Sequence, residues 1–174
     1  MGVELAGRRA LIFAGNDYED LELWYPLLRL REAGLNVTVA GQQPGPYRGK
    51  NGYPCVADSG LDGHRGGDFA VVVCPGGWMP DKLRRDPRVQ QILREADAAK
   101  RVIAAICHGG WMPISAGVLR GVRVTGSPGI KDDLVNAGAV YEDAAVVVDR
   151  HHVSSRKPDD LPDFMKGIFA ALGR

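Results

Sequence analysis

The chain has 174 residues and a mass of 18.7 kDa, which is enough for one compact domain that buries roughly two-thirds of its unfolded surface. Its composition, 45% hydrophobic and 25% charged, excludes a disordered or fibrous chain. The 22 Lys and Arg residues nearly balance the 21 Asp and Glu residues, so a net charge of +1 does not favour nucleic acid or an acidic membrane surface as a partner. We therefore expect a single domain over residues 1–174.

The sequence carries no segment that predicts membrane insertion or export. Its longest apolar runs, 69–74 and 102–107, are far shorter than the roughly 20 residues of a transmembrane helix. The N-terminal region lacks the apolar core of a signal peptide. Three widely spaced cysteines, Cys55, Cys74 and Cys107, fit a reducing compartment. We expect a cytoplasmic protein without a membrane partner.

No metal or cofactor is expected from the sequence patterns. His64, His151 and His152 do not show the spacing of metal ligands, and the Gly-rich turns lack both the phosphate-cradling and the dinucleotide fingerprints.

Predicted strands alternate with predicted helices along the chain. Buried or half-buried apolar runs predict strands at 8–14, 35–40, 69–74, 102–106, 122–125, 146–148 and 152–154. Helical periodicity predicts helices at 21–31, after Pro87, and at 109–118, 130–137 and 161–172. In the first helix the positions Leu21, Trp24, Leu27, Leu28 and Arg31 recur at intervals of three and four.

The segment 42–67 interrupts this alternation. It is rich in Gly and Pro and contains Lys50-Asn51-Gly52, which predicts a loop with a β-hairpin beside the main sheet. The rest of the pattern requires crossover helices between parallel strands. The predicted fold is a three-layer α/β/α sandwich of flavodoxin-like type, with a mainly parallel sheet and a β-hairpin excursion.

Folds of this kind place their sites beyond the carboxyl ends of the strands. The segments expected there are 15–19, 75–78, 107–110 and 126–129. Cys107 follows a buried strand and precedes His108-Gly109-Gly110. This order predicts a sharp strand-to-helix turn that exposes the thiol, with Gly109 relieving crowding and the helix N-terminus favouring the thiolate.

Other residues of the same crevice could assist Cys107. Glu19 is predicted to donate a hydrogen bond to the sulfur and to act as a general acid and base, unless it is only a solvated charge at a helix start. The amides of Gly76 and Gly77 could face an oxyanion, although an ordinary glycine turn explains them equally well. His108 is adjacent to Cys107, so we expect the two side chains to diverge, and His108 would need a third group such as Asp81 to act as a base.

Six stretches carry a resemblance to a known family that covers nearly the whole chain. They are 18–26, 75–77, 106–109, 115–121, 128–133 and 153–156. With these stretches the chain resembles the PfpI family of intracellular cysteine proteases and amidases. That family belongs to the superfamily of the Parkinson's-associated deglycase and the class I glutamine amidotransferases.

The resemblance implies roles for several residues. Cys107 is the nucleophile, Glu19 the carboxyl bonded to its sulfur, and the amides of Gly77 and His108 an oxyanion pocket. It also implies a homo-oligomer in which an acidic residue of a neighbouring subunit completes a Cys-His-acid arrangement. The matching position here is Asp81, one carbon shorter than the Glu expected there.

The chain also departs from the family pattern beside the expected nucleophile. Gly110-Trp111 replaces a Pro and a smaller residue, and Ser127 stands where many members carry Tyr. Trp111 and Ser127 are therefore expected to shape the substrate pocket.

Three functions follow from these residues. The first is a cofactor-independent enzyme in which Cys107 attacks a small reactive carbonyl, such as methylglyoxal, and Glu19 moves the proton. The second is hydrolysis of a peptide or amide by Cys107, with His108 and Asp81 acting across a subunit interface. The third is a non-enzymatic redox sensor or chaperone based on oxidation of Cys107.

Overall fold

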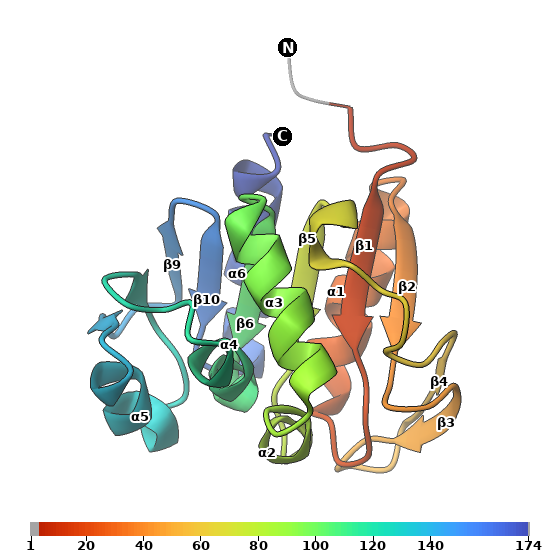
Figure 1. Ribbon diagram of the computed structural model, residues 1–174, viewed down its shortest axis with the longest axis horizontal. Helices are drawn as coiled ribbons and strands as arrows, with labels where there is room; N and C mark the ends of the chain where they lie inside the picture. The colour runs from red at the N-terminus through yellow and green to blue at the C-terminus, as the bar shows by residue number, and fades with distance from the viewer. Residues whose placement is uncertain (1–3, 174) are drawn as a thin grey trace.

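The computed structural model describes residues 4–173, in which a six-stranded sheet forms the centre (Figure 1). The strand order is β2-β1-β5-β6-β10-β9, and all neighbouring pairs are parallel except β10 and β9. The strands are β1 (Arg9–Phe13), β2 (Asn36–Ala40), β5 (Val71–Cys74), β6 (Val102–Ile106), β9 (Val146–Asp149) and β10 (His152–Ser155). The mainly parallel sheet that the sequence predicts is therefore confirmed.

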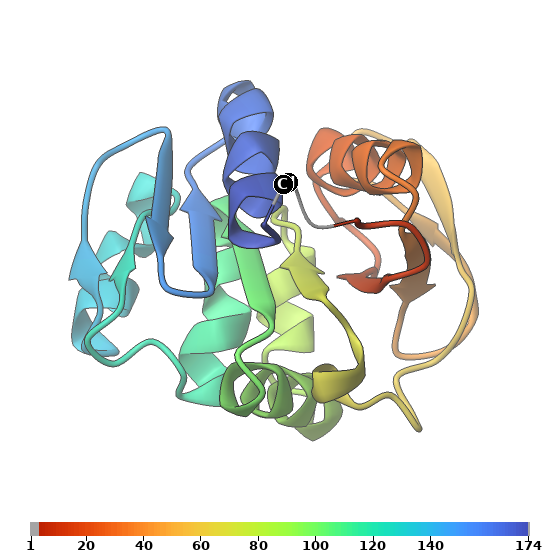
Figure 2. The same cartoon turned by 90° about the horizontal axis from the view of Figure 1, so that it is seen from above.

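Helices cover both faces of this sheet (Figure 2). The α-helices are α1 (Asp20–Glu32), α2 (Met79–Leu83), α3 (Pro87–Ala98), α4 (Trp111–Ala116), α5 (Lys131–Asn136) and α6 (Leu161–Ala171). Helices α1 and α6 pack together on one face, and α3 and α4 on the other. Short 3-10 helices occupy Gly66–Asp68, Cys107–Gly110, Pro128–Ile130 and Pro158–Asp160. The arrangement is the predicted three-layer, flavodoxin-like fold.

The central strands are formed by residues that suit burial on both sides. Every residue of β5 and β6 is buried, as expected for parallel strands covered by two helical layers. Helix α1 buries a different stripe from the predicted one: Leu23, Leu27 and Leu30 face the sheet. Leu21 and Leu28 are 57% and 55% exposed, because the helix is rotated by about one residue from the predicted phase. Within residues 4–173, no helix combines the length and apolar character that spanning a bilayer requires.

Two elements differ from the expected alternation. The strand predicted at 122–125 is β7 (Arg123–Val124), which pairs with β8 (Val140–Tyr141) in a separate two-stranded sheet. A small core that includes Leu119, Ile130 and Leu134 lies beneath it. Helix α2 was not predicted, because its five residues are too few to show a helical repeat.

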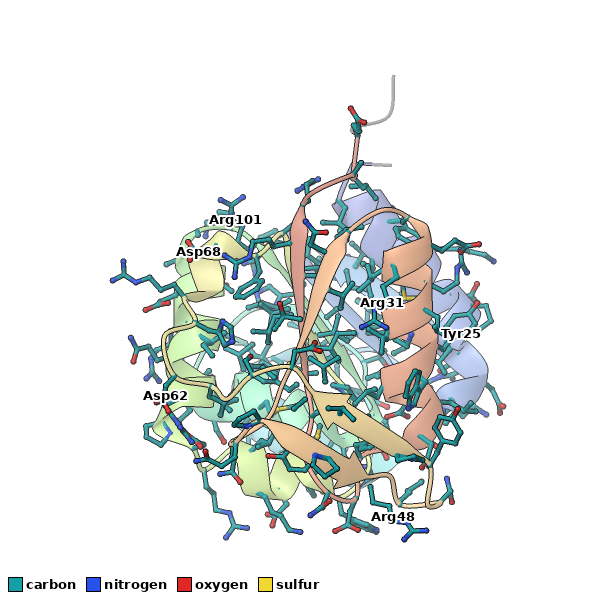
Figure 3. All side chains as sticks on the ribbon, turned by 90° about the vertical axis from the view of Figure 1, so that its right-hand side faces the viewer. Tyr25, Arg31, Arg48, Asp62, Asp68 and Arg101 are labelled. Carbon is teal, nitrogen blue, oxygen red and sulfur yellow. The ribbon has the colours of Figure 1, made fainter. Side chains whose placement is uncertain are left out.

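The predicted hairpin is present as β3 (Gly45–Arg48) and β4 (Pro54–Ala57), with Lys50 in its connection. Figure 3 shows it crossing near the start of α1, with Arg48 close to the connection. Asp20, in the first turn of α1, accepts hydrogen bonds from the backbone N–H groups of Asn51 (3.0 Å) and Tyr53 (2.9 Å). Gly49 packs directly against the same carboxylate. The carboxylate of Asp20 therefore fixes the connection that carries Lys50.

Replacing Asp20 by Ala should loosen this connection, because two part-buried N–H groups lose their acceptor. We expect Asp20→Ala to lower the free energy of unfolding by about 1–3 kcal/mol, measured by urea denaturation, and to speed amide exchange at residues 49–53. The control is Glu32→Ala, which removes an exposed i,i+3 ion pair and should change stability by less than about 0.5 kcal/mol. Equal effects of the two substitutions would contradict the anchoring role of Asp20.

Candidate functional site

The four segments expected in one crevice do meet at the carboxyl ends of the central strands. The backbone N–H of Glu19 donates to the Gly76 carbonyl (3.0 Å), which joins the loops after β1 and β5. The backbone N–H of Ser127 donates to the Cys107 carbonyl (3.3 Å), which joins the loop after β7 to the turn after β6. The topology therefore gathers these loops around Cys107.

Cys107 lies at a sharp turn between β6 and the 3-10 helix Cys107–Gly110. Its φ angle of 59° is in the left-handed region, which a residue with a side chain rarely adopts and which costs about 1–3 kcal/mol. A side chain at Gly109 would overlap the carbonyl oxygen of Cys74, so only glycine lets the turn pack this close to β5. The geometry of the turn matches the nucleophile elbow that the sequence predicts.

The acid beside the sulfur is Glu22, not Glu19. The side chain of Glu22 is fully buried, and its Oε2 accepts a hydrogen bond from the Gly76 N–H at 2.7 Å. A Cβ on Gly76 would overlap Glu22 Oε2 and would lie 2.9 Å from Cys107 Cβ. Gly76 thus lies against both the Glu22 carboxyl and Cys107, and the two groups are near enough to shift each other's pKa.

The prediction that the Glu19 carboxyl lies at the sulfur is therefore wrong. Glu19 is the N-cap of α1, and its Oε2 accepts a hydrogen bond from the backbone N–H of Glu22 at 2.9 Å. This bond holds the Glu19 carboxylate at the start of the helix, which is a favourable position for a negative charge. Glu22 lies one turn further on, in helical phase with the buried residues Pro26 and Leu30. An acid in phase with a buried stripe is the sequence signal that identifies it.

Burial controls the protonation of Glu22. Burial raises the pKa of Glu22 to about 8, and the negative charge of Glu19 is the second largest cause of this rise. The hydrogen bond from the Gly76 N–H opposes it. Oε2 is the oxygen that accepts from Gly76, whereas Oε1 is buried and has no hydrogen-bond partner among the described residues. Oε1 is thus the oxygen best placed to carry the proton.

The protonation of Cys107 depends on that of Glu22. Burial, and next the negative charge of an ionised Glu22, raise the pKa of the Cys107 thiol, while the backbone N–H of His108 lowers it. Two anions side by side in this buried site are unfavourable. An ionised Glu22 therefore opposes formation of the thiolate beyond the effect of burial, so the pair carries at most one negative charge at a time.

His108 is close to the sulfur, contrary to the predicted divergence. Its Nδ1 lies 3.2 Å from Cys107 Sγ, because the left-handed backbone of Cys107 turns the two side chains to the same side. The imidazole lies between Trp78 and Trp111, with ring centroids 5.6 and 5.1 Å away. Burial and the nearby Lys50 charge lower the pKa of His108, which favours the neutral imidazole. Trp111 is held by a 2.8 Å hydrogen bond from its Nε1 to Asp133.

The remaining predicted residues occupy different surroundings. Gly76 was expected to offer its amide to an oxyanion, but that N–H is already bonded to Glu22. Gly77 packs against the backbone of 17–19 with a φ of 83°, and its oxyanion role stays a prediction. Ser127 accepts a 3.4 Å hydrogen bond from the Gly129 N–H at the start of a 3-10 helix.

Asp81 does not complete a triad within this chain. It lies on α2, is more than half exposed, and forms an ion pair with Arg85 at 2.8 Å. No hydrogen bond or ion pair joins it to His108 among the described residues. A contact across a subunit interface stays a prediction.

Lys50 belongs to the site, although no sequence pattern beyond the predicted hairpin pointed to it. Its backbone N–H donates to the Tyr18 carbonyl at 2.8 Å, which brings the hairpin connection to the loop after β1. The positive charge of Lys50 partly opposes the rise in the pKa values of Glu22 and Cys107, and it adds to the lowering of the pKa of His108. The site therefore combines a thiol, a protonatable acid, an imidazole and one exposed cation.

Known proteins are similar to this chain in sequence and in fold. A deglycase of Pyrococcus abyssi is 43% identical over 164 residues, which cover 94% of this chain and 99% of that protein. Protein/nucleic acid deglycase 2 of Escherichia coli is 36% identical over 169 residues, covering 95% of this chain and 98% of its own length.

A solved structure from Anabaena variabilis, a two-domain protein with DJ-1/ThiJ/PfpI-like and ferritin-like domains, matches with a TM-score of 0.92 and 38% identity. The match covers 95% of this chain and 48% of that one, so the chain spans about half of the two-domain protein. The DJ-1/PfpI family itself matches residues 8–171. With its fold, its strand-to-helix turn at Cys107 and this match over nearly its whole length, the chain belongs to the DJ-1/PfpI family.

Proposed function

We propose that this protein is a cofactor-independent enzyme of glyoxalase or deglycase type, which acts on small reactive carbonyls such as 2-oxoaldehydes. The observation that carries the proposal is the pair of half-buried Cys107 and fully buried Glu22, which places a nucleophile beside an acid able to keep its proton near neutral pH. The names of the relatives from P. abyssi and E. coli support a deglycase. Glu22 takes the role that the sequence analysis gave to Glu19.

The first step is addition to the aldehyde. The Cys107 thiolate attacks the aldehyde carbon, a sulfur–carbon bond forms, and the carbonyl electron pair moves to oxygen. That oxygen takes the proton from Glu22, which leaves a hemithioacetal and a Glu22 carboxylate. The carboxylate is now at its least stable, because it is buried near Glu19, and it is ready to take a proton back.

The second step moves a proton between neighbouring carbons. The Glu22 carboxylate removes the proton from the carbon bonded to sulfur while the adjacent carbonyl oxygen takes a proton, which gives an enediol. Glu22 then returns its proton to the second carbon, and the hydroxyl on the first carbon loses its proton and becomes the carbonyl of a thioester of a 2-hydroxy acid. Water then adds to the thioester carbon and the sulfur–carbon bond breaks. The products are the hydroxy acid and the regenerated pair, so methylglyoxal and water give lactate without an external oxidant or reductant.

Nearby groups stabilise charge during these steps. The backbone N–H of His108 stabilises the thiolate, and the backbone N–H of Gly77 is the proposed donor to the carbonyl oxygen. Lys50 adds a positive charge close enough to affect Glu22, Cys107 and His108.

A second candidate function is hydrolysis of a peptide or amide. The observation that favours it is the 3.2 Å contact between His108 Nδ1 and Cys107 Sγ, which is the arrangement of an acyl-transfer nucleophile and its base. In this proposal Asp81 of a second copy orients His108, and the active species is a homo-oligomer.

Turnover should depend on Glu22 and not on Glu19. We expect Cys107→Ser to abolish lactate formation from methylglyoxal without glutathione, and Glu22→Gln to lower kcat by about 10²–10⁴-fold, because glutamine cannot transfer the proton. Glu19→Gln keeps an oxygen for the Glu22 N–H and should retain turnover within about threefold of the parent. Loss of turnover in Glu19→Gln with activity retained in Glu22→Gln would contradict the assignment.

The raised pKa of Glu22 should also be visible in stability. The pKa of Glu22 is about 8 in the folded protein and has its ordinary, lower value in the unfolded chain. Its contribution to stability is therefore complete below the unfolded-state pKa and is lost as the pH rises to the folded-state pKa. The difference in unfolding free energy between wild type and Glu22→Gln should therefore fall from about pH 5 to about pH 8, by up to about 1.4 kcal/mol per pH unit. Urea denaturation at several pH values measures it, and a constant or rising difference would contradict burial of a protonated Glu22.

Asp81 separates the two enzymatic proposals. Because Asp81 does not contact the Cys107–Glu22 pair, Asp81→Asn should leave lactate formation within about twofold of wild type. The peptidase proposal instead requires this substitution to remove cleavage of a fluorogenic peptide by the assembled protein. Wild-type peptide cleavage that survives in Asp81→Asn would rule out the interface triad.

A further inference from the structure

A second cluster of functional side chains lies at the opposite end of the sheet from Cys107. Asp97 comes from the last turns of α3, and His151 and His152 lie at the start of β10. The Nε2 atoms of His151 and His152 lie 2.7 and 3.0 Å from the same oxygen, Asp97 Oδ1. His152 pairs with Ile103 near the beginning of β6, whereas Cys107 follows the end of that strand. Figure 1 shows the C-terminal end of α3 at the same end of the sheet as the beginning of β10.

The three ligand atoms already converge on one point. One atom from each residue lies within 4.8 Å of the other two, and the two imidazole rings are 4.5 Å apart. Imidazole nitrogen and carboxylate oxygen are the donors that Zn²⁺ and neighbouring divalent ions prefer. Ligand atoms around a tetrahedral ion with bonds of about 2.0–2.1 Å are about 3.3 Å apart, so the cluster needs shifts of less than about 1 Å to receive one.

We propose that Asp97, His151 and His152 form a binding site for a divalent transition-metal ion, with Zn²⁺ as the expected occupant. His151 and His152 are mostly buried and are therefore held in place, whereas the Asp97 side chain is 31% exposed and gives the ion a route from solvent. This exposure also leaves room for water as a fourth ligand. Each imidazole binds through Nε2, so its remaining hydrogen lies on Nδ1.

The expected effect of the ion is stabilisation. It would connect the end of α3 to the beginning of β10, two elements whose ligands are 54 and 55 residues apart in the chain. An ion that binds only the folded chain raises its stability by mass action. His152 pairs with the beginning of β6, whereas Cys107 follows its end, so the proposal does not depend on the carbonyl chemistry. The sequence pattern did not indicate this site, because the third ligand, Asp97, is 54 and 55 residues away from the two histidines in the chain.

The test uses the full chain with Cys107→Ser, which removes the one part-exposed thiol as a competing metal ligand. After treatment with a chelator, Zn²⁺ is titrated by calorimetry and the melting temperature is recorded with and without it. We expect one equivalent to bind and the melting temperature to rise. Adding Asp97→Asn should weaken binding by at least about tenfold and remove the thermal shift, whereas the control Asp163→Asn, at an exposed helix position, should change neither.

Failure to bind Zn²⁺ in the Cys107→Ser chain, or unchanged binding in Asp97→Asn, would overturn the proposal. If Asp97→Asn does not fold, imidazole nitrogen NMR of the Cys107→Ser chain decides. The chain has four histidines, and Zn²⁺ should shift the Nε2 signals of His151 and His152 while those of His64 and His108 stay in place. Shifts confined to His64 or His108 would equally overturn it.

Discussion

The hydrogen bond between the Gly76 N–H and the carboxyl of Glu22 is the contact on which the proposed chemistry depends. It holds an acid in the core of the protein, directly against the turn that carries Cys107. An ionised carboxylate is unfavourable there, so burial raises the pKa of Glu22 into the range of neutral pH. The thiolate of Cys107 is unfavourable for the same reason while Glu22 is ionised. In the proposed mechanism this constraint lets the pair move a single proton between sulfur, carboxyl and substrate.

The fold supplies this constraint through local packing around small residues. Gly76 leaves space for the carboxyl, and Gly109 lets the turn after β6 approach the end of β5. The left-handed conformation of Cys107 then directs its thiol and the ring of His108 to the same side. On α1, Glu19 caps the helix and Asp20 anchors the hairpin connection, so that successive acids serve three separate purposes.

The sequence predicted the layers of this fold well, because alternating buried strands and amphipathic helices leave strong periodic signals. The strand Val102–Ile106 and the elbow at Cys107 were located correctly. The choice between Glu19 and Glu22 required the rotational phase of α1, which Leu21 and Leu28 obscured because they are apolar and yet exposed. The contacts of Lys50 and the convergence of Asp97 with His151 and His152 depend on tertiary packing between distant segments, which local periodicity does not encode.

Glu22 is expected to hold a proton near neutral pH while it faces the Cys107 thiol. Isotope-edited infrared difference spectroscopy between wild type and Glu22→Gln measures this directly, since a protonated carboxyl and a carboxylate absorb in separate regions. With a pKa of about 8, Glu22 should show the carboxylic-acid band at pH 7 and lose it as the pH rises beyond that value. A carboxylate band alone at pH 7 would contradict the account.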